Sequence, residues 1–142
     1  MELARQTLKE GNYTCVVAEG EKVIFTSKDR GIKPLVEYCH QYGGAHPGAV
    51  LADKVIGRAA ALLCCLAGIR ELHTGVLSQG ALDELNKAGI RAGYDTKVEA
   101  IRNRDNTGFC PMEALSKGVD DPEEMLRKAE EFLAGLEKKS RG

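Results

Sequence analysis

One stretch of the chain, residues 53–68, is almost entirely small or apolar, and it constrains the fold more than any other feature. Its sequence is DKVIGRAAALLCCLAG, and from Ala59 to Ala67 it is apolar on every side. A helix that is hydrophobic all round is buried in a protein core, whereas spanning a bilayer takes about 20 apolar residues. We therefore expect the central helix of a soluble α/β domain, fed by a strand that ends at Asp53 and Lys54.

The composition argues against several classes of partner. The chain has 142 residues, of which 29% are charged, and a formal net charge of −1. This leaves no basic excess for nucleic acids or for anionic membranes. The first twenty residues lack the apolar run of a signal peptide. We expect a cytoplasmic protein with no nucleic-acid partner and no membrane partner.

The order of β-branched runs and turn residues predicts a mixed sheet. The expected helices lie at 2–10, 29–42, 57–67 and 78–88, then from 111 and from 121, and the expected strands lie at 13–18, 22–27, 49–52, 72–77 and 90–96. A glycine-containing turn joins the first two strands into a hairpin. The later alternation of strand and helix is typical of right-handed crossovers in a mainly parallel sheet.

This order of elements resembles the cytidine-deaminase-like fold. In that family the buried helix begins with His-Ala-Glu or Cys-Ala-Glu and the next helix with Pro-Cys-x-x-Cys, which together hold a zinc ion and place a proton-transferring glutamate. The corresponding segments here are GRAAA at 57–61 and SQGA at 78–81, which contain no cysteine, histidine or glutamate. The resemblance implies one domain over residues 1–142, a three-layer α/β/α sandwich with an N-terminal hairpin. It implies no zinc-dependent deaminase activity.

The chain also resembles a small prokaryotic family of unknown function. That family is typified by a Gly-x-Ala-Ala-Ala helix start and a Cys-Pro-Met-Glu segment. Here these features are GRAAA at 57–61 and CPME at 110–113, and the resemblance spans about residues 10–135. It implies the deaminase-like fold without the metal site, and it implies no particular function.

The histidines and cysteines do not suggest a metal site. His40, His46 and His73 have no paired spacing, whereas zinc sites usually show close ligand pairs. Cys64 and Cys65 are neighbours within the apolar helix, so we expect both to behave as small core residues. We expect no metal, no cofactor and no disulfide framework.

The candidate ligand-binding residues surround the start of the buried helix. They are Asp53, Lys54, Gly57, Arg58, Asn103 and Arg104. Ligands of open α/β sheets bind outside the carboxyl ends of strands, and unpaired N–H groups at a helix start favour an anion. We expect a small anionic or nucleotide-like ligand, with Arg58 and Arg104 at the anion and Asp53 and Asn103 hydrogen-bonded to the remainder. Alternatively, these charges form solvated surface pairs that contribute little.

Cys110 suggests a different function, that of a metal-independent enzyme. It precedes an expected helix start, where the helix dipole lowers a thiol pKa. Glu113 is placed to accept a proton or to cap that helix, and Asp53 is an alternative assisting group. A structural or ligand-contacting role is the other interpretation of Cys110. A third function is that of a non-catalytic assembly or scaffold protein, and the resemblance leaves a homo-oligomer open.

Overall fold

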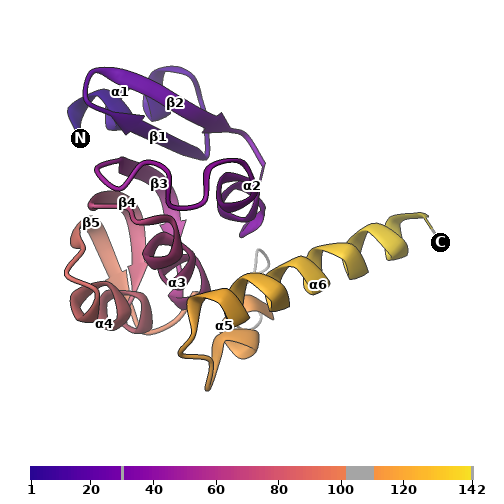
Figure 1. The fold of residues 1–142 in the computed structure, drawn as a ribbon. Coiled ribbons are helices and arrows are strands. Elements are labelled where there is room, and N and C mark those ends of the chain that lie inside the picture. The colour runs from indigo at the N-terminus through magenta and orange to yellow at the C-terminus, as the bar shows by residue number, and fades with distance from the viewer. Residues whose placement is uncertain (30, 102–110, 142) are drawn as a thin grey trace.

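The computed structural model describes residues 1–29, 31–101 and 111–141, with side chains as far as residue 135. Its elements in chain order are α1 (Glu2–Glu10), β1 (Cys15–Glu19), β2 (Lys22–Ser27), α2 (Lys33–Tyr42), β3 (Val50–Ile56), α3 (Arg58–Ala67), β4 (Glu71–Ser78), α4 (Gln79–Lys87), β5 (Arg91–Val98), α5 (Pro111–Ser116) and α6 (Pro122–Arg141). Figure 1 shows their arrangement. None of these helices is both long and apolar enough to cross a membrane.

The strands form one five-stranded mixed sheet in the order β2-β1-β3-β4-β5. β1 is antiparallel to β2 and to β3, whereas β3, β4 and β5 are parallel. The helices α3 and α4 make the connections between the parallel strands. The predicted hairpin, the α/β class and the mainly parallel second half of the sheet are confirmed.

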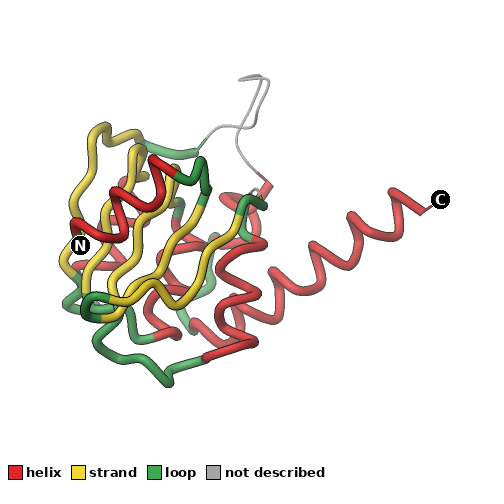
Figure 2. The backbone as a smooth tube through the Cα atoms, turned by 90° about the horizontal axis from the view of Figure 1, so that it is seen from above, coloured by secondary structure: helices red, strands yellow, loops and turns green. Residues whose placement is uncertain are grey.

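The two faces of the sheet are covered unequally (Figure 2). α1 packs on one face against the hairpin and β3, around a small cluster that includes Ala4, Val16 and Ala52. The larger core lies on the other face, where α3 contacts α2, α4, α5 and α6. α6 contributes Met125 and Ala129 to this core, and its C-terminal end extends away from the body of the domain (Figure 1).

The predicted central helix is confirmed as α3. Every residue from Ala59 to Cys64 is buried, and Ala67 is buried as well. Gly68 ends the helix in the left-handed region at φ +71°, where its N–H reaches the carbonyls of Cys64 and Cys65. Glycine adopts this conformation without the steric penalty of a side chain. The apolar run between two glycines therefore marks both the position and the burial of α3.

Two predicted boundaries are wrong. β3 continues to Ile56, so Asp53 and Lys54 lie inside the strand instead of at its end. Pairing with β4 extends the strand, because Asp53 lies opposite Thr74 and Ile56 lies opposite Leu77. Such pairing outweighs the low strand propensity of aspartate and lysine. The helix expected from residue 29 begins at Lys33, next to a proline in its first turn, a position that favours proline.

Candidate functional site

A pocket of about 370 Å³ lies at the start of α3. Its lining residues are Thr14, Asp29, Gly31, Ile32, Pro34, Asp53, Lys54, Val55, Gly57, Ala59, Ala60, Ile101, Met112 and Glu113. Small-molecule sites occupy about 300–1,000 Å³ and combine apolar walls with a few polar groups. The lining of this pocket has the same character, and it lies outside the last residues of β3, where α/β sheets bind their ligands.

Asp53 is the central polar group of the pocket. Its side chain leaves the middle of the sheet, and one carboxylate oxygen accepts a hydrogen bond from the Val55 N–H at 3.2 Å. Cys15 lies directly opposite on β1, and its thiol donates a second hydrogen bond to the carboxylate. Burial nevertheless raises the pKa of Asp53 from 3.8 to about 7, because desolvation disfavours the charged form more than these hydrogen bonds favour it. Asp53 can therefore exchange a proton near neutral pH.

Glu113 comes from α5, and its carboxylate lies at the first turn of α3. A β-carbon built on Gly57 would approach the Glu113 Oε1 atom to 2.6 Å, which shows how closely the two residues pack. Burial raises the pKa of Glu113, and hydrogen bonds from the backbone amides of Arg58 and Ile101 partly oppose this rise. The Glu113 carboxylate therefore caps the first turn of α3, at the position where we expected a ligand anion.

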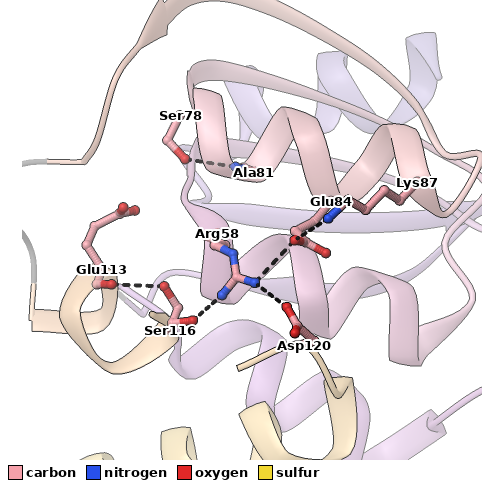
Figure 3. A network of polar contacts seen from close by, with 8 residues as sticks. All are labelled: Arg58, Ser78, Ala81, Glu84, Lys87, Glu113, Ser116 and Asp120. Carbon is pink, nitrogen blue, oxygen red and sulfur yellow. Dashed lines mark hydrogen bonds and ion pairs between the residues drawn. The ribbon is translucent and has the colours of Figure 1, made fainter. Parts of the chain in front are cut away.

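Arg58 is not among the residues that line the pocket, and other groups of the chain engage its guanidinium. The guanidinium points toward α4 and the α5–α6 connection (Figure 3). It donates to the Ser116 carbonyl and forms ion pairs with Glu84 at 3.2 Å and with Asp120 at 3.1 Å. The Ser116 hydroxyl in turn donates to the Glu113 carbonyl at 2.9 Å. Arg58 therefore holds elements together around α3, and its donors are directed away from the pocket.

The other predicted residues divide into two groups. Asp53, Lys54 and Gly57 all line the pocket, which brings half of the predicted set together. Asn103 and Arg104 lie outside the described residues. Cys110 also lies outside the described residues, so the structure adds no support to its proposed role as a nucleophile.

Sequence reasoning missed the wall of the pocket formed by the segment before α2 and by the first turn of α2. Asp29 and Ile32 from that segment and Pro34 from α2 line the pocket, as does Thr14, the residue before β1. The Thr14 hydroxyl donates to the Asp29 carbonyl at 2.5 Å, which ties the two segments together. No local pattern in the sequence predicts this contact, because the contact depends on how the hairpin folds back beside β3.

The described histidines are dispersed, and each pairs with a different carboxylate. His40 pairs with Glu130 at 3.0 Å. His46 pairs with Glu19 at 3.2 Å, and His73 pairs with Asp95 at 3.6 Å. Within the described part of the chain, no group of three His, Cys, Asp or Glu side chains is arranged to hold a metal ion.

Comparisons with known proteins identify the family. Residues 3–133 match the family described as TM1506, a domain of unknown function (DUF1893). The chain is also similar to the crystal structure of a DUF1893 family protein (TM1506) from Thermotoga maritima, determined at 2.70 Å resolution. The two are 32% identical with a TM-score of 0.81, and the match covers 89% of this chain and 86% of that chain. A comparison with curated proteins gives no match. The chain therefore belongs to the DUF1893 family.

Proposed function

We propose that this protein binds a small nucleotide-like molecule in the pocket at the start of α3. The observation that carries the proposal is the placement of one half-buried carboxyl group, Asp53, in the wall of a mainly apolar pocket of about 370 Å³. Burying a carboxyl group without a charged partner lowers the stability of the folded chain, and perturbed carboxyl groups in pockets are typical of functional sites.

The pocket suggests how such a ligand lies. Ile32, Pro34 and Met112 provide apolar surface for a flat ring, while Asp53 accepts hydrogen bonds from the N–H groups of that ring. Lys54 is exposed, and its ammonium group provides a contact for an anionic substituent that points outward. This arrangement keeps the expected nucleotide-like ligand but moves its anionic part away from the first turn of α3, which Glu113 already caps.

We also propose that the domain has the deaminase-like, three-layer α/β/α fold. The proposal is supported by the strand order, by the antiparallel hairpin before parallel strands, and by a buried helix after β3. In this arrangement the GRAAA segment at 57–61 stands where deaminases carry a zinc ligand and, two residues later, the proton-transferring glutamate. The segment contains neither a zinc ligand nor a carboxylate, so we expect EDTA to leave the melting temperature unchanged. A marked loss of stability with EDTA would contradict the expected lack of a zinc site.

A thermal-shift screen tests the binding proposal. Bases, nucleosides, nucleotides and inorganic phosphate are added to the wild type, to Asp53→Asn and to Asp83→Asn, an exposed position on α4. A ligand that binds the folded state raises the melting temperature. We expect a shift with one nucleotide-like class, lost in Asp53→Asn and retained in Asp83→Asn. A shift with none of the compounds would overturn the proposal.

A further inference from the structure

The charges that line the pocket have an unexpected sign for a chain expected to bind an anion. Three carboxyl groups, those of Asp29, Asp53 and Glu113, face one ammonium group, that of Lys54. Lys54 is also exposed, so water weakens its field at the pocket. The interior of the pocket is therefore suited to hydrogen-bond donors and positive charge.

The three carboxyl groups are not equally available to a ligand. Glu113 is engaged by the backbone amides of Arg58 and Ile101. Asp29 lies at the outer end, with nearly half of its side chain exposed, and pairs with Lys33 at 4.0 Å. Asp53 keeps acceptor capacity, because each carboxylate oxygen accepts about two hydrogen bonds. Among residues 1–29, 31–101 and 111–135, its oxygens receive donors only from the Cys15 thiol and from the backbone next to it.

From this distribution we infer that the ligand presents a planar nitrogen cation, of the amidinium or protonated amino-heterocycle class, to the Asp53 carboxylate. This inference rests on the proposed function, because it identifies which part of the ligand enters the same pocket. Two parallel N–H groups match the two oxygens of a carboxylate, which is the strongest geometry for this kind of hydrogen bond. Between residues 1–29, 31–101 and 111–135, no lysine or arginine nitrogen lies within 4.0 Å of the Asp53 carboxylate to compete for it.

The ion pair is coupled to release of a proton. In the empty pocket near pH 7 the Asp53 carboxyl group is about half protonated. A bound cation favours the carboxylate, so the carboxyl proton passes to solvent as the ion pair forms, and the total charge is conserved. Affinity for a permanent cation therefore rises with pH through the pKa of Asp53.

The groups around Asp53 do not replace it in this titration. The thiols of Cys15 on β1 and Cys64 on α3 stay neutral near pH 7, because burial raises the pKa of both. Lys54 follows Asp53 on its own strand, and Asp29 lies at the outer end of the pocket. Glu113 is the other carboxyl group with a raised pKa, and its contribution is separated from that of Asp53 by the variants below.

A series of three nearly isosteric probes tests the inference: benzamidine, benzamide and benzoate. Their binding to the wild type, Asp53→Asn and Asp83→Asn is measured by calorimetry at pH 6, 7 and 8, in phosphate and in Tris. Asp83→Asn is the matched control, since it makes the same change at an exposed position on α4, outside the pocket. Benzamidine stays protonated over this range. We expect the wild type to bind benzamidine most tightly and benzoate least, with an affinity for benzamidine about tenfold higher at pH 8 than at pH 6.

Comparing the binding enthalpies in the two buffers gives the number of protons released, because phosphate and Tris take up a proton with different enthalpies. We expect about half a proton released per benzamidine bound at pH 7, and none in Asp53→Asn, which also loses the preference for the cation. Asp83→Asn keeps both properties. The inference is overturned if benzamide or benzoate binds as tightly as benzamidine, if the preference survives in Asp53→Asn, or if no probe binds. The proposed function fails separately, only when the wider nucleotide screen gives no binding either.

Discussion

Burial disfavours the charged form of Asp53, so its ionisation affects the free energy of unfolding of the whole chain. Its pKa is about 7 in the folded protein and 3.8 as the ordinary value. Between these values the folded state binds the proton more tightly than the unfolded state, so the Asp53 contribution to the free energy of unfolding falls as pH rises. At about 1.4 kcal/mol per pKa unit, the upper limit of this loss is roughly 4 kcal/mol.

Urea unfolding at pH 5 and pH 8 measures this loss. We expect Asp53→Asn to be more stable than the wild type at pH 8, where the wild-type carboxylate is charged, and to gain less or nothing at pH 5. Asp83→Asn, at an exposed site on α4, is expected to follow the wild type at both pH values. An identical pH dependence in Asp53→Asn and the wild type would show that Asp53 is not desolvated.

Glu113 and Gly57 form a coupled pair at the first turn of α3. Gly57 has φ −98°, a backbone conformation that any residue adopts, so an alanine there acts through its methyl group alone. That methyl group would approach Glu113 Oε1 to 2.6 Å and displace the carboxylate that caps the helix. We expect Gly57→Ala and Glu113→Ala each to cost about 1 kcal/mol, the usual worth of a helix cap.

The double variant tests this coupling. Both single changes remove the same cap, so Gly57→Ala combined with Glu113→Ala should cost less than the two single changes added together. Chemical denaturation of the four proteins gives the coupling free energy. Additive costs, within about 0.5 kcal/mol, would mean that Glu113 does not stabilise α3.

The packing of α3 against its neighbouring helices depends on Arg58. The Arg58 side chain is 17% exposed and the paired Glu84 side chain is 12% exposed, whereas the Asp120 side chain is 88% exposed. Removing one partner of a buried ion pair leaves the other charge uncompensated, at a cost of about 3–5 kcal/mol. Exposed pairs contribute about 0–1 kcal/mol. The Arg58–Glu84 pair, which joins α3 to α4, should therefore contribute more to the free energy of unfolding than the Arg58–Asp120 pair, which joins α3 to the α5–α6 connection.

Thermal and urea unfolding of three variants measure how much each of these two ion pairs contributes to the free energy of unfolding. We expect Arg58→Met to cost about 2–4 kcal/mol, somewhat less than a fully buried pair because Lys87 remains 3.5 Å from Glu84. Adding Glu84→Gln should recover part of this loss, and Asp120→Asn alone should cost less than 1 kcal/mol. Equal costs for Arg58→Met and Asp120→Asn would contradict this assignment.

Helix boundaries were predictable where a local signal sets them. Ser78 caps α4, since its hydroxyl accepts the Ala81 N–H at 3.1 Å. Asp121 likewise precedes α6 and accepts the Glu123 N–H at 3.2 Å. The length of β3 was not predictable from its own residues, because the pairing of Asp53 and its neighbours with β4 decides it. Local capping therefore fixes the starts of α4 and α6, whereas pairing with β4 decides where β3 ends.

The candidate site was predictable only where backbone topology decides it. The crevice beside Asp53, Lys54 and Gly57 follows from a strand that leads into a buried helix, and these residues line the pocket. The direction of Arg58 depends on carboxylates that only tertiary packing brings near it, on α4 and after α5. The same is true of the carboxylate that fills the expected anion position, since Glu113 follows α3 by more than forty residues of sequence.

Together, β3, α2, α3 and α5 and the segments before β1 and before α2 enclose one pocket with an acidic interior. Family membership leaves its ligand open, because the match is to a domain of unknown function. The chemistry of the pocket therefore carries the functional account. Its central claim is that a small molecule enters this pocket and contacts Asp53.

The most direct test is an NMR titration of the ¹⁵N-labelled protein with the compound that gives the largest thermal shift. The account predicts that amide signals of Lys54, Ala59 and Ala60 move together with a single dissociation constant, and that these changes disappear in Asp53→Asn. Changes confined to the surface of β5 or α6, or an unchanged response in Asp53→Asn, would contradict it.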